Sequence, residues 1–291
     1  MPRSSAASRS SEPCRAGSAT SEADIARLDA ELVRRGLARS RGEARELIEA
    51  GAVSVNGRAA RKPASPADEA TVVEVTSDGP RWVGRAAHKL DHAFSTWSQA
   101  GLSAEGRECL DVGASTGGFT QVLLAQGARH VVALDVGHDQ LVAELREDVR
   151  VTERSGTSIR DVTREDLGTF DVIVGDLSFI SLRLVLAPVA ALARPGADVV
   201  LLVKPQFEVG RGRLSKNGIV TDPRHRRQAL TDVLSTADEV GLGIHGLTRS
   251  PIHGGEGNTE YLLWARSGIS GTMDPSAVAS AIRDLSQEER A

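Results

Sequence analysis

The hydrophobic pattern of residues 24–76 predicts two short helices. Apolar side chains recur at helical spacing ahead of Gly36, which ends the first predicted helix; they are Ile25, Leu28 and Leu32. Ser40 and Glu43 fit a capping box, which predicts the start of a second helix. The apolar face of that second helix is predicted to hold Ala44, Leu47 and Ile48.

Two short strands are predicted after these helices. Val53 and Val55 alternate with polar residues and run into Asn56-Gly57, a dipeptide that favours a tight hairpin turn. Residues 71–75 are predicted to form the returning strand. Two helices and a sheet of this size cannot enclose a large cleft, so the unit is predicted to be a binding module rather than a catalytic one.

From about residue 88 to 266, apolar strand patterns alternate with segments long enough for helices. The strand patterns lie at 110–112, 131–134, 172–174 and 199–203. This alternation predicts an α/β fold with a parallel sheet and helices on both faces. Residues 243–248 and 261–265 break the alternation, and we predict two antiparallel strands joined by a glycine-rich loop.

The same changes of pattern predict the domain boundaries. Residues 1–20 are rich in Ser, Ala and Arg without an apolar period, which indicates a disordered tail. The remaining predicted units are a small domain at 21–80, a linker at 81–87, a large α/β domain at 88–268 and a polar C-terminal tail at 269–291.

Composition narrows the class of protein. The chain has 291 residues, of which 40% are hydrophobic and 25% charged, as is typical of a globular protein. The sequence contains no stretch of about 18 apolar residues, so no transmembrane helix is predicted. The two cysteines lie far apart in dissimilar surroundings, which favours a reducing cytoplasm over a disulfide framework. We therefore expect a cytoplasmic protein, monomeric and without a membrane partner.

The net charge of −4 argues weakly against a nucleic-acid partner, but charge is unevenly distributed. Residues 1–90 hold 15 Lys/Arg against 12 Asp/Glu, whereas the rest of the chain holds 20 against 27. A basic patch interrupts the acidic part. A solvated surface and a phosphate-binding rim both fit such a patch, which contains Arg211, Arg213, Lys216, Arg224, Arg226 and Arg227.

A glycine-rich loop follows the first predicted strand of the large domain. In the run DVGASTGGFT, Gly113 permits a tight turn, and Gly117 and Gly118 let the backbone approach a ligand and let the next helix pack on the strand. Asp135 ends the next strand, where an acid can hydrogen-bond both hydroxyls of a ribose. Together these features predict a site for an adenosine cofactor.

The loop spacing distinguishes among such cofactors. It reads G-x-x-x-G-G, unlike the dinucleotide pattern G-x-G-x-x-G, and no nucleotide-triphosphate loop follows. Asp111 would repel a pyrophosphate but suits the cationic amino-acid end of S-adenosylmethionine. A glycine-rich turn without a ligand is the alternative. The predicted contacts to S-adenosylmethionine are Asp111, Gly113, Ser115, Gly117, Gly118, Phe119, Asp135, Val136, Asp161 and Asp176.

Four charged residues lie at strand ends or beside the linker. Asp176 and Lys204 end two strands, Glu260 precedes the last strand, and Lys89 follows the linker. Each alone fits a solvated cap, but ligands of open α/β sheets bind at the carboxyl ends of the strands. The set suits methylation of a hydroxyl, whose oxygen loses its proton as it attacks a sulfonium methyl.

In this interpretation Lys204 is the base, with Lys89 as the neighbouring cation that lowers its pKa toward ~7–8. Asp176 would orient Lys204, and Glu260 would position the ribose or its proton. No metal is expected, because the histidines show no ligand spacing.

These stretches resemble the TlyA-type rRNA 2′-O-methyltransferases, and the large domain is similar to the wider FtsJ-like group. The matching stretches are ARLDAELVRRGLARSRGEARELIEAGAVSVNG, RWVGRAAHKL, DVGASTGGFT, VGDLSFISL, VKPQFEVGRG and GNTEYLLW. The resemblance implies a class I Rossmann-like methyltransferase sheet with an antiparallel last strand, preceded by a small α+β RNA-binding domain of the S4 type. It also implies that Lys89, Asp176, Lys204 and Glu260 form the family's Lys-Asp-Lys-Glu catalytic set.

The activity implied is 2′-O-methylation of cytidine in 16S or 23S rRNA, or in both, with ribosomal subunits as partners. Gln121 departs from the family pattern, where Asp is usual, and Ser158 stands where Asn is expected on the adenine side of the cofactor. The implied RNA contacts are Arg27, Arg34, Arg35, Arg39, Arg41, Arg45, Arg58, Arg61 and Lys62 in the small domain and Arg211, Arg213 and Lys216 in the large one.

Three other functions fit parts of the sequence. A membrane-active haemolysin is suggested by the family's older name, although no apolar span supports it. A nicotinamide dehydrogenase would use the same sheet but is disfavoured by the loop spacing and by Asp111. An RNA-binding protein with an inactive catalytic domain is disfavoured because all four candidate catalytic residues are present.

Overall fold

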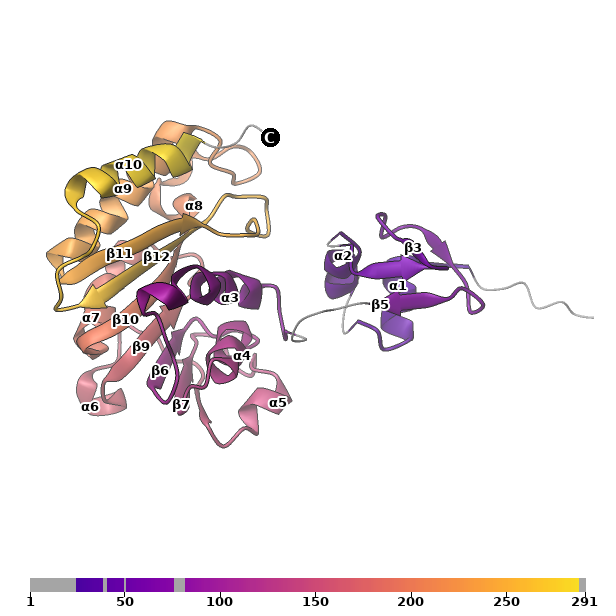
Figure 1. The fold of residues 1–291 in the computed structure, drawn as a ribbon, viewed down its shortest axis with the longest axis horizontal. Coiled ribbons are helices and arrows are strands. Elements are labelled where there is room, and N and C mark those ends of the chain that lie inside the picture. Colours follow the sequence, from indigo (N-terminus) through magenta and orange to yellow (C-terminus); the bar gives the residue numbers. More distant parts are fainter. Residues whose placement is uncertain (1–24, 39–40, 50, 76–81, 288–291) are drawn as a thin grey trace, which may run out of the picture. The chain divides into compact units, whose positions relative to one another are not determined.

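A computed structural model describes residues 25–38, 41–49, 51–75 and 82–287, which belong to two compact units. The first unit spans residues 1–79 and the second spans residues 80–291 (Figure 1). The predicted disordered tail at 1–20, Arg39 and Ser40 lie outside the described residues.

The first unit packs two helices on small antiparallel sheets. Helices α1 (Leu28–Arg34) and α2 (Arg41–Glu49) share an apolar core with strand β2 (Val53–Val55). Strand β2 pairs with β3 (Arg58–Ala59) and with β5 (Val73–Val75). Asn56 and Gly57 take positive φ values of 50° and 74° between β2 and β3, which confirms the predicted hairpin turn.

The first predicted helix begins later than its sequence pattern indicates. Ile25 is 69% exposed, and the next two residues form β1 (Ala26–Arg27), which pairs with β4 (Pro66–Ala67). Ile25 therefore lies outside the helix, because the pairing of β1 with β4 holds the backbone extended before α1 begins at Leu28.

The second unit is built on a seven-stranded sheet in the order β11-β12-β10-β9-β6-β7-β8. Strand β12 is antiparallel to both of its neighbours, and the other pairs are parallel, as predicted. The strands are β6 (Glu108–Val112), β7 (His130–Leu134), β8 (Val151–Arg154), β9 (Phe170–Gly175), β10 (Ala193–Val203), β11 (Leu242–Arg249) and β12 (Tyr261–Ser267).

Helices cover both faces of this sheet, each over its own apolar core (Figure 1). On one face lie α3 (Ala86–Trp97), α4 (Gly118–Ala125) and α5 (Ala143–Arg146). On the other lie η2 (Leu182–Leu184), α6 (Arg164–Leu167), α7 (Leu186–Leu192), α9 (Pro223–Glu239) and α10 (Pro275–Gln287). The single turns η1 (Ser98–Ala100), α8 (Pro205–Glu208) and η3 (Arg211–Arg213) connect these elements.

The strand order predicts a ligand-binding crevice next to β6. The chain runs outward from β6 to β7 and β8 and then returns to β9 on the opposite side of β6. Loops from the carboxyl ends of β6 and β9 therefore leave the sheet in opposite directions and open a crevice between them. The glycine-rich loop and Asp176 follow these two strands.

Three details differ from the sequence prediction. Strand β8 was not predicted, since its sequence VTER is polar. Within the predicted linker at 81–87, Trp82 and Ala87 are buried in the same apolar core as α3, and Ala87 belongs to that helix. The predicted polar tail at 269–291 contains α10, whose Ile282 and Ser286 are buried against the rest of the unit.

Candidate active site

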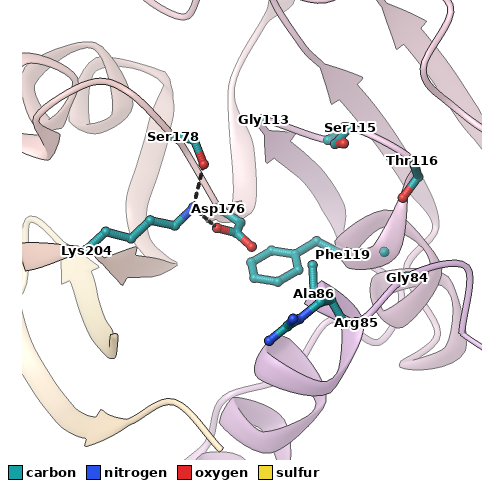
Figure 2. A pocket seen from close by; sticks show the side chains of 12 residues that line it. Gly84, Arg85, Ala86, Gly113, Ser115, Thr116, Phe119, Asp176, Ser178 and Lys204 are labelled. Carbon is teal, nitrogen blue, oxygen red and sulfur yellow. Dashed lines mark hydrogen bonds and ion pairs between the residues drawn. The ribbon is translucent and has the colours of Figure 1, made fainter. Parts of the chain in front are cut away.

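A cavity of about 260 Å³ opens at the carboxyl ends of β6 and β9 (Figure 2). Three segments distant in sequence form its wall: the approach to α3, the glycine-rich loop and the strand ends that carry the candidate catalytic residues. The lining residues are Gly84, Arg85, Ala86, Gly113, Ala114, Ser115, Thr116, Gly118, Phe119, Asp176, Ser178 and Lys204.

The glycines of the loop are required by close packing. Gly113 has a φ of +83°, and a Cβ there would lie 3.2 Å from the carbonyl oxygen of Asp176. Gly117 has a φ of +99°, and a Cβ there would overlap Leu145 and approach Leu141 to 2.7 Å. Larger residues would therefore push the loop out of the crevice. Gly117 itself supports the loop and does not line the cavity.

Asp111 lies beneath the loop and is fully buried. Its Oδ2 accepts a hydrogen bond of 2.7 Å from the Thr120 hydroxyl, whereas its Oδ1 has no partner in the described part of the chain. Burial raises the pKa of Asp111 to about 7. Asp111 lines neither hollow, so its contact with the cationic amino-acid end of S-adenosylmethionine stays a prediction, which the unpaired Oδ1 supports.

Asp135 follows β7 and faces a second, smaller hollow beside the loop. Its Oδ2 accepts from the Ser115 backbone N–H at 2.8 Å, and its Oδ1 accepts from that of Gly137 at 2.7 Å. Val136 and Asp161 are exposed and line neither hollow. Asp135 is thus held next to the loop by backbone N–H groups, and its contact with a ribose stays a prediction, as do the cofactor contacts of Val136 and Asp161.

The four candidate catalytic side chains converge beside the cavity. Nζ of Lys89 donates to Oε2 of Glu260 at 2.8 Å and to Oδ2 of Asp176 at 3.2 Å. Nζ of Lys204 lies 2.6 Å from Oδ1 of Asp176 (Figure 2). Asp176 therefore bridges two ammonium groups. The four residues come from α3, the end of β9, the end of β10 and the start of β12.

The charges of this quartet compensate one another. Burial acts to raise the pKa of Asp176, but the ion pairs with Lys204 and Lys89 outweigh it and hold the pKa below its usual value. Asp176 is therefore a carboxylate at neutral pH. Two cations and two acids in contact allow charged groups to be buried without an unpaired charge.

Two residues that the sequence analysis missed lie next to Lys204. Nζ of Lys204 donates to the Ser178 hydroxyl at 2.7 Å (Figure 2). Phe179 follows, with a φ of +65° and 92% of its surface exposed, and its ring centroid is 5.3 Å from that of Phe207. An exposed phenylalanine in this strained conformation is unusual. Their only signal in the sequence is their place in the run VGDLSFISL, because neither residue is charged.

Gln121 and Arg85 hold the segment ahead of α3. Oε1 of Gln121 accepts from the Val83 backbone N–H at 2.7 Å, which gives this departure from the family pattern a structural role. Arg85, a further lining residue that was not predicted, donates to the carbonyl oxygen of His253. The Gln121 bond fixes this segment to α4, and the Arg85 bond fixes it to the loop that leads to Glu260.

Comparison with known proteins identifies the family. The FtsJ-like methyltransferase family matches residues 82–267, and the S4 domain family matches residues 26–73. Over 259 residues, 88% of this chain and 96% of the relative, the chain is 47% identical to the 16S/23S rRNA (cytidine-2′-O)-methyltransferase TlyA of Mycobacterium tuberculosis. The chain belongs to the TlyA-type FtsJ-like methyltransferases.

Two further comparisons agree with this assignment. Hemolysin A of Brachyspira hyodysenteriae is 41% identical over 81% of this chain and 98% of its own length. A solved structure described as a hemolysin, from Streptococcus thermophilus, superposes with a TM-score of 0.69 at 35% identity, covering 91% of this chain and 96% of that one. The family confirms the predicted methyltransferase fold and S-adenosylmethionine as its cofactor, and it rules out the nicotinamide dehydrogenase.

The predicted RNA contacts of the S4 domain fall into two groups. Around the buried Asp29 and Glu31 lie Arg27, Arg34, Arg35, Arg41 and Arg45, each in an ion pair with one of the two acids. The bonds from Arg34 and Arg35 hold the pKa of Glu31 at about 2. The second group, Arg58, Arg61 and Lys62, is exposed and has no ion-pair partner among the described residues.

Arg35 differs from the other predicted RNA contacts. Its guanidinium also donates to the carbonyl oxygens of Thr71 at 2.7 Å and Asp68 at 2.6 Å, and its side chain is only 22% exposed. These bonds join α1 to the loop before β5. Arg35 therefore has a structural role in this domain, and its contact with RNA stays a prediction.

The basic patch of the methyltransferase domain is also divided. Arg211, Arg213 and Lys216 are exposed on and after η3. Arg226 is 1% exposed and donates to the carbonyl oxygens of Val220 and Ser286. Placing Arg226 in a surface patch is therefore wrong, because its guanidinium joins α9 to α10.

Two further features are absent from residues 25–38, 41–49, 51–75 and 82–287. No group of three or more His, Cys, Asp or Glu side chains there could hold a metal ion. No helix in that part of the chain is both long and apolar enough to cross a membrane.

Proposed function

We propose that the protein transfers a methyl group from S-adenosylmethionine to the 2′-oxygen of a cytidine in ribosomal RNA. The observation that supports this most directly is the continuous line of contacts from Lys204 through Asp176 and Lys89 to Glu260 beside the cavity. The relative from Mycobacterium tuberculosis is named as an rRNA (cytidine-2′-O)-methyltransferase, which supports the same substrate.

The residues of this chain would each take a part of the reaction. When bound, S-adenosylmethionine supplies a methyl group activated by its sulfonium charge. Lys204 lies on the cavity wall and, in its neutral form, would take the proton of the ribose 2′-hydroxyl. Asp176 and Ser178 hold its Nζ in place from two sides. Lys89 would hold Asp176 and Glu260 in position, and Glu260 would position the ribose.

Binding of the RNA would rely on charge and shape. The S4 domain presents Arg58, Arg61 and Lys62 to solvent, and the methyltransferase domain presents Arg211 and Arg213. Lys and Arg side chains neutralise RNA phosphates without reading sequence. Aromatic residues make up 3% of the chain, which favours recognition of folded RNA by shape and phosphate position. We place the enzyme with ribosomes in the cytoplasm and expect it to act as a monomer.

The proposal is tested with purified protein, labelled S-adenosylmethionine and isolated small and large ribosomal subunits that lack the modification. Nuclease digestion of the product should release labelled 2′-O-methylcytidine from one subunit or both. Label in a base-methylated nucleoside, or in no nucleoside, would contradict the proposal. Free rRNA tested beside the subunits shows whether the folded particle is required.

A further inference from the structure

The short helix α8 contacts several segments of the site at once. Its N-cap, Lys204, pairs with Asp176, and the side chains that follow reach other segments. Gln206 reaches Glu260, and Phe207 packs on Phe179. One turn of the chain therefore touches both the loop after β9 and the loop before β12.

Each carboxylate oxygen of Glu260 accepts one side-chain hydrogen bond. Lys89 donates to Oε2 at 2.8 Å, and Nε2 of Gln206 donates to Oε1 at 3.2 Å. Glu260 is 3% exposed, and a Cβ on Gly254 would lie 2.6 Å from Oε1, so backbone packs against this oxygen. The carboxylate is thus held on one side by α3 and on the other by α8.

The orientation of the Gln206 amide is determined by Glu260. Turning the amide over would place its carbonyl oxygen against a carboxylate oxygen, with two acceptors facing each other. In the observed orientation, Oε1 of Gln206 is buried and has no hydrogen-bond partner among the described residues. A buried unpaired acceptor is unfavourable. The amide keeps this orientation because the bond to Glu260 outweighs that cost.

We propose that Gln206 is a positioning residue that fixes Glu260 relative to Lys204. The two residues lie on the same turn, so the amide sets the distance between the proposed base and the second acid. Gln206 takes no proton and does not belong to the Lys-Asp-Lys-Glu set. This role rests on the proposed function, because it assumes that Lys204 and Glu260 act on the same ribose.

Two substitutions separate positioning from packing. Gln206→Leu keeps the size of the side chain but donates no hydrogen bond, and it should lower kcat by about 10- to 100-fold, the range for removing a bond to a charged group. Its dissociation constants for S-adenosylmethionine and for the ribosomal subunit should stay within about twofold of wild type. Gln228→Glu is the matched control, since Gln228 is exposed on α9 and donates to Asp232 at 2.6 Å.

Gln206→Glu adds a signature in pH. When protonated, the new carboxyl group can donate to Glu260 as the amide does; when ionised, it repels Glu260. The ratio of its kcat to that of wild type should therefore rise as pH falls from about 9 to 6, while the ratio for Gln206→Leu stays flat. If Gln206→Leu does not fold, the ratio for Gln206→Glu decides alone.

The outcomes separate this inference from the proposed function. Wild-type protein that methylates no ribosomal subunit refutes the proposed function itself. Wild-type protein that methylates normally, with a flat ratio for Gln206→Glu or with kcat of Gln206→Leu within twofold of wild type, overturns the positioning role of Gln206 alone.

Discussion

Oδ1 of Asp176 lies 2.6 Å from Nζ of Lys204, although the two residues follow different strands and are 28 positions apart. This contact gives Lys204 a fixed direction at the wall of the cavity. The same carboxylate binds Lys89 through its other oxygen, which extends the line of contacts to Glu260. The position of Lys204 therefore depends on Asp176, and that of Asp176 depends on both lysines.

Replacing Lys204 with alanine should remove the base. We expect kcat for methyl transfer to fall by about 10²- to 10⁴-fold, the usual contribution of general base catalysis. Binding of S-adenosylmethionine, measured by calorimetry, and binding of the ribosomal subunit should change by less than about threefold. A rate within fivefold of wild type would show that another group takes the proton.

Asp111 should make the stability of the cofactor-free protein depend on pH. Its pKa is raised to about 7 in the fold and is 3.8 as a model value, so the folded state retains a proton that the unfolded state has released. The contribution of Asp111 to the free energy of unfolding should therefore be fully present below pH 3.8 and be lost as pH rises toward and through 7. Between pH 5 and pH 7 the loss attributable to this group is about 2–3 kcal/mol.

Comparing the free energy of unfolding of wild type with that of Asp111→Asn isolates the contribution of Asp111. Asparagine can still accept a hydrogen bond from Thr120 but does not titrate. Unfolding can be followed by tryptophan fluorescence, because the three tryptophans, Trp82, Trp97 and Trp264, all belong to the methyltransferase unit. Parallel stability curves for the variant and wild type between pH 5 and pH 7 would show that Asp111 does not titrate in this range.

Gly117→Ala should disturb the cofactor loop. The added methyl group would overlap Leu145, and alanine would have to adopt a φ of +99°, which costs about 1–3 kcal/mol. We expect at least a tenfold weaker affinity for S-adenosylmethionine in a binding titration. Gly212→Ala is the matched control, because its Cβ would meet nothing within 4 Å. Equal affinities of the two variants would contradict the role given to Gly117.

Replacing Arg61 and Lys62 with alanine should weaken RNA binding. The two side chains are exposed, so the substitutions should remove phosphate contacts without disturbing the fold. Each cation removed should reduce the slope of log affinity against log salt concentration by about 0.7–0.9. A filter-binding series across salt concentrations measures the slope. Arg129→Ala and Arg150→Ala serve as charge-matched controls, since the two residues precede β7 and β8 and so lie at the amino ends of strands, whereas the cavity opens at carboxyl ends. Unchanged slopes in the Arg61 and Lys62 variants would exclude these contacts.

Sequence reasoning could find those site residues that have a suitable chemical group or a glycine and also directly follow an apolar strand. Gly113 and Asp135 follow apolar strands, and Asp176 and Lys204 do the same, so the rule that ligands bind at strand ends brought them to one edge. That rule could not show that one carboxylate bridges two lysines, because the bridge depends on side-chain geometry across four segments of the chain.

Other parts of the site had no signal that sequence reasoning could use. Gln206 and Ser178 are uncharged and follow no spacing rule, yet both contact the quartet. Arg226 resembled a surface cation because its carbonyl partners lie as far as 60 positions away. Strand β8 was missed because its sequence is polar, and the polar positions of α10 hid the few side chains that this helix buries.

If this quartet serves methyl transfer to the 2′-oxygen of a ribosomal cytidine, the protein must change the map of 2′-O-methylated nucleotides in the rRNAs of its native cell. Deleting the gene should remove the mark from one or more cytidines, wild-type protein should restore it, and Lys204→Ala protein should not. Identical maps with and without the protein, or full restoration by the Lys204→Ala variant, would contradict the account.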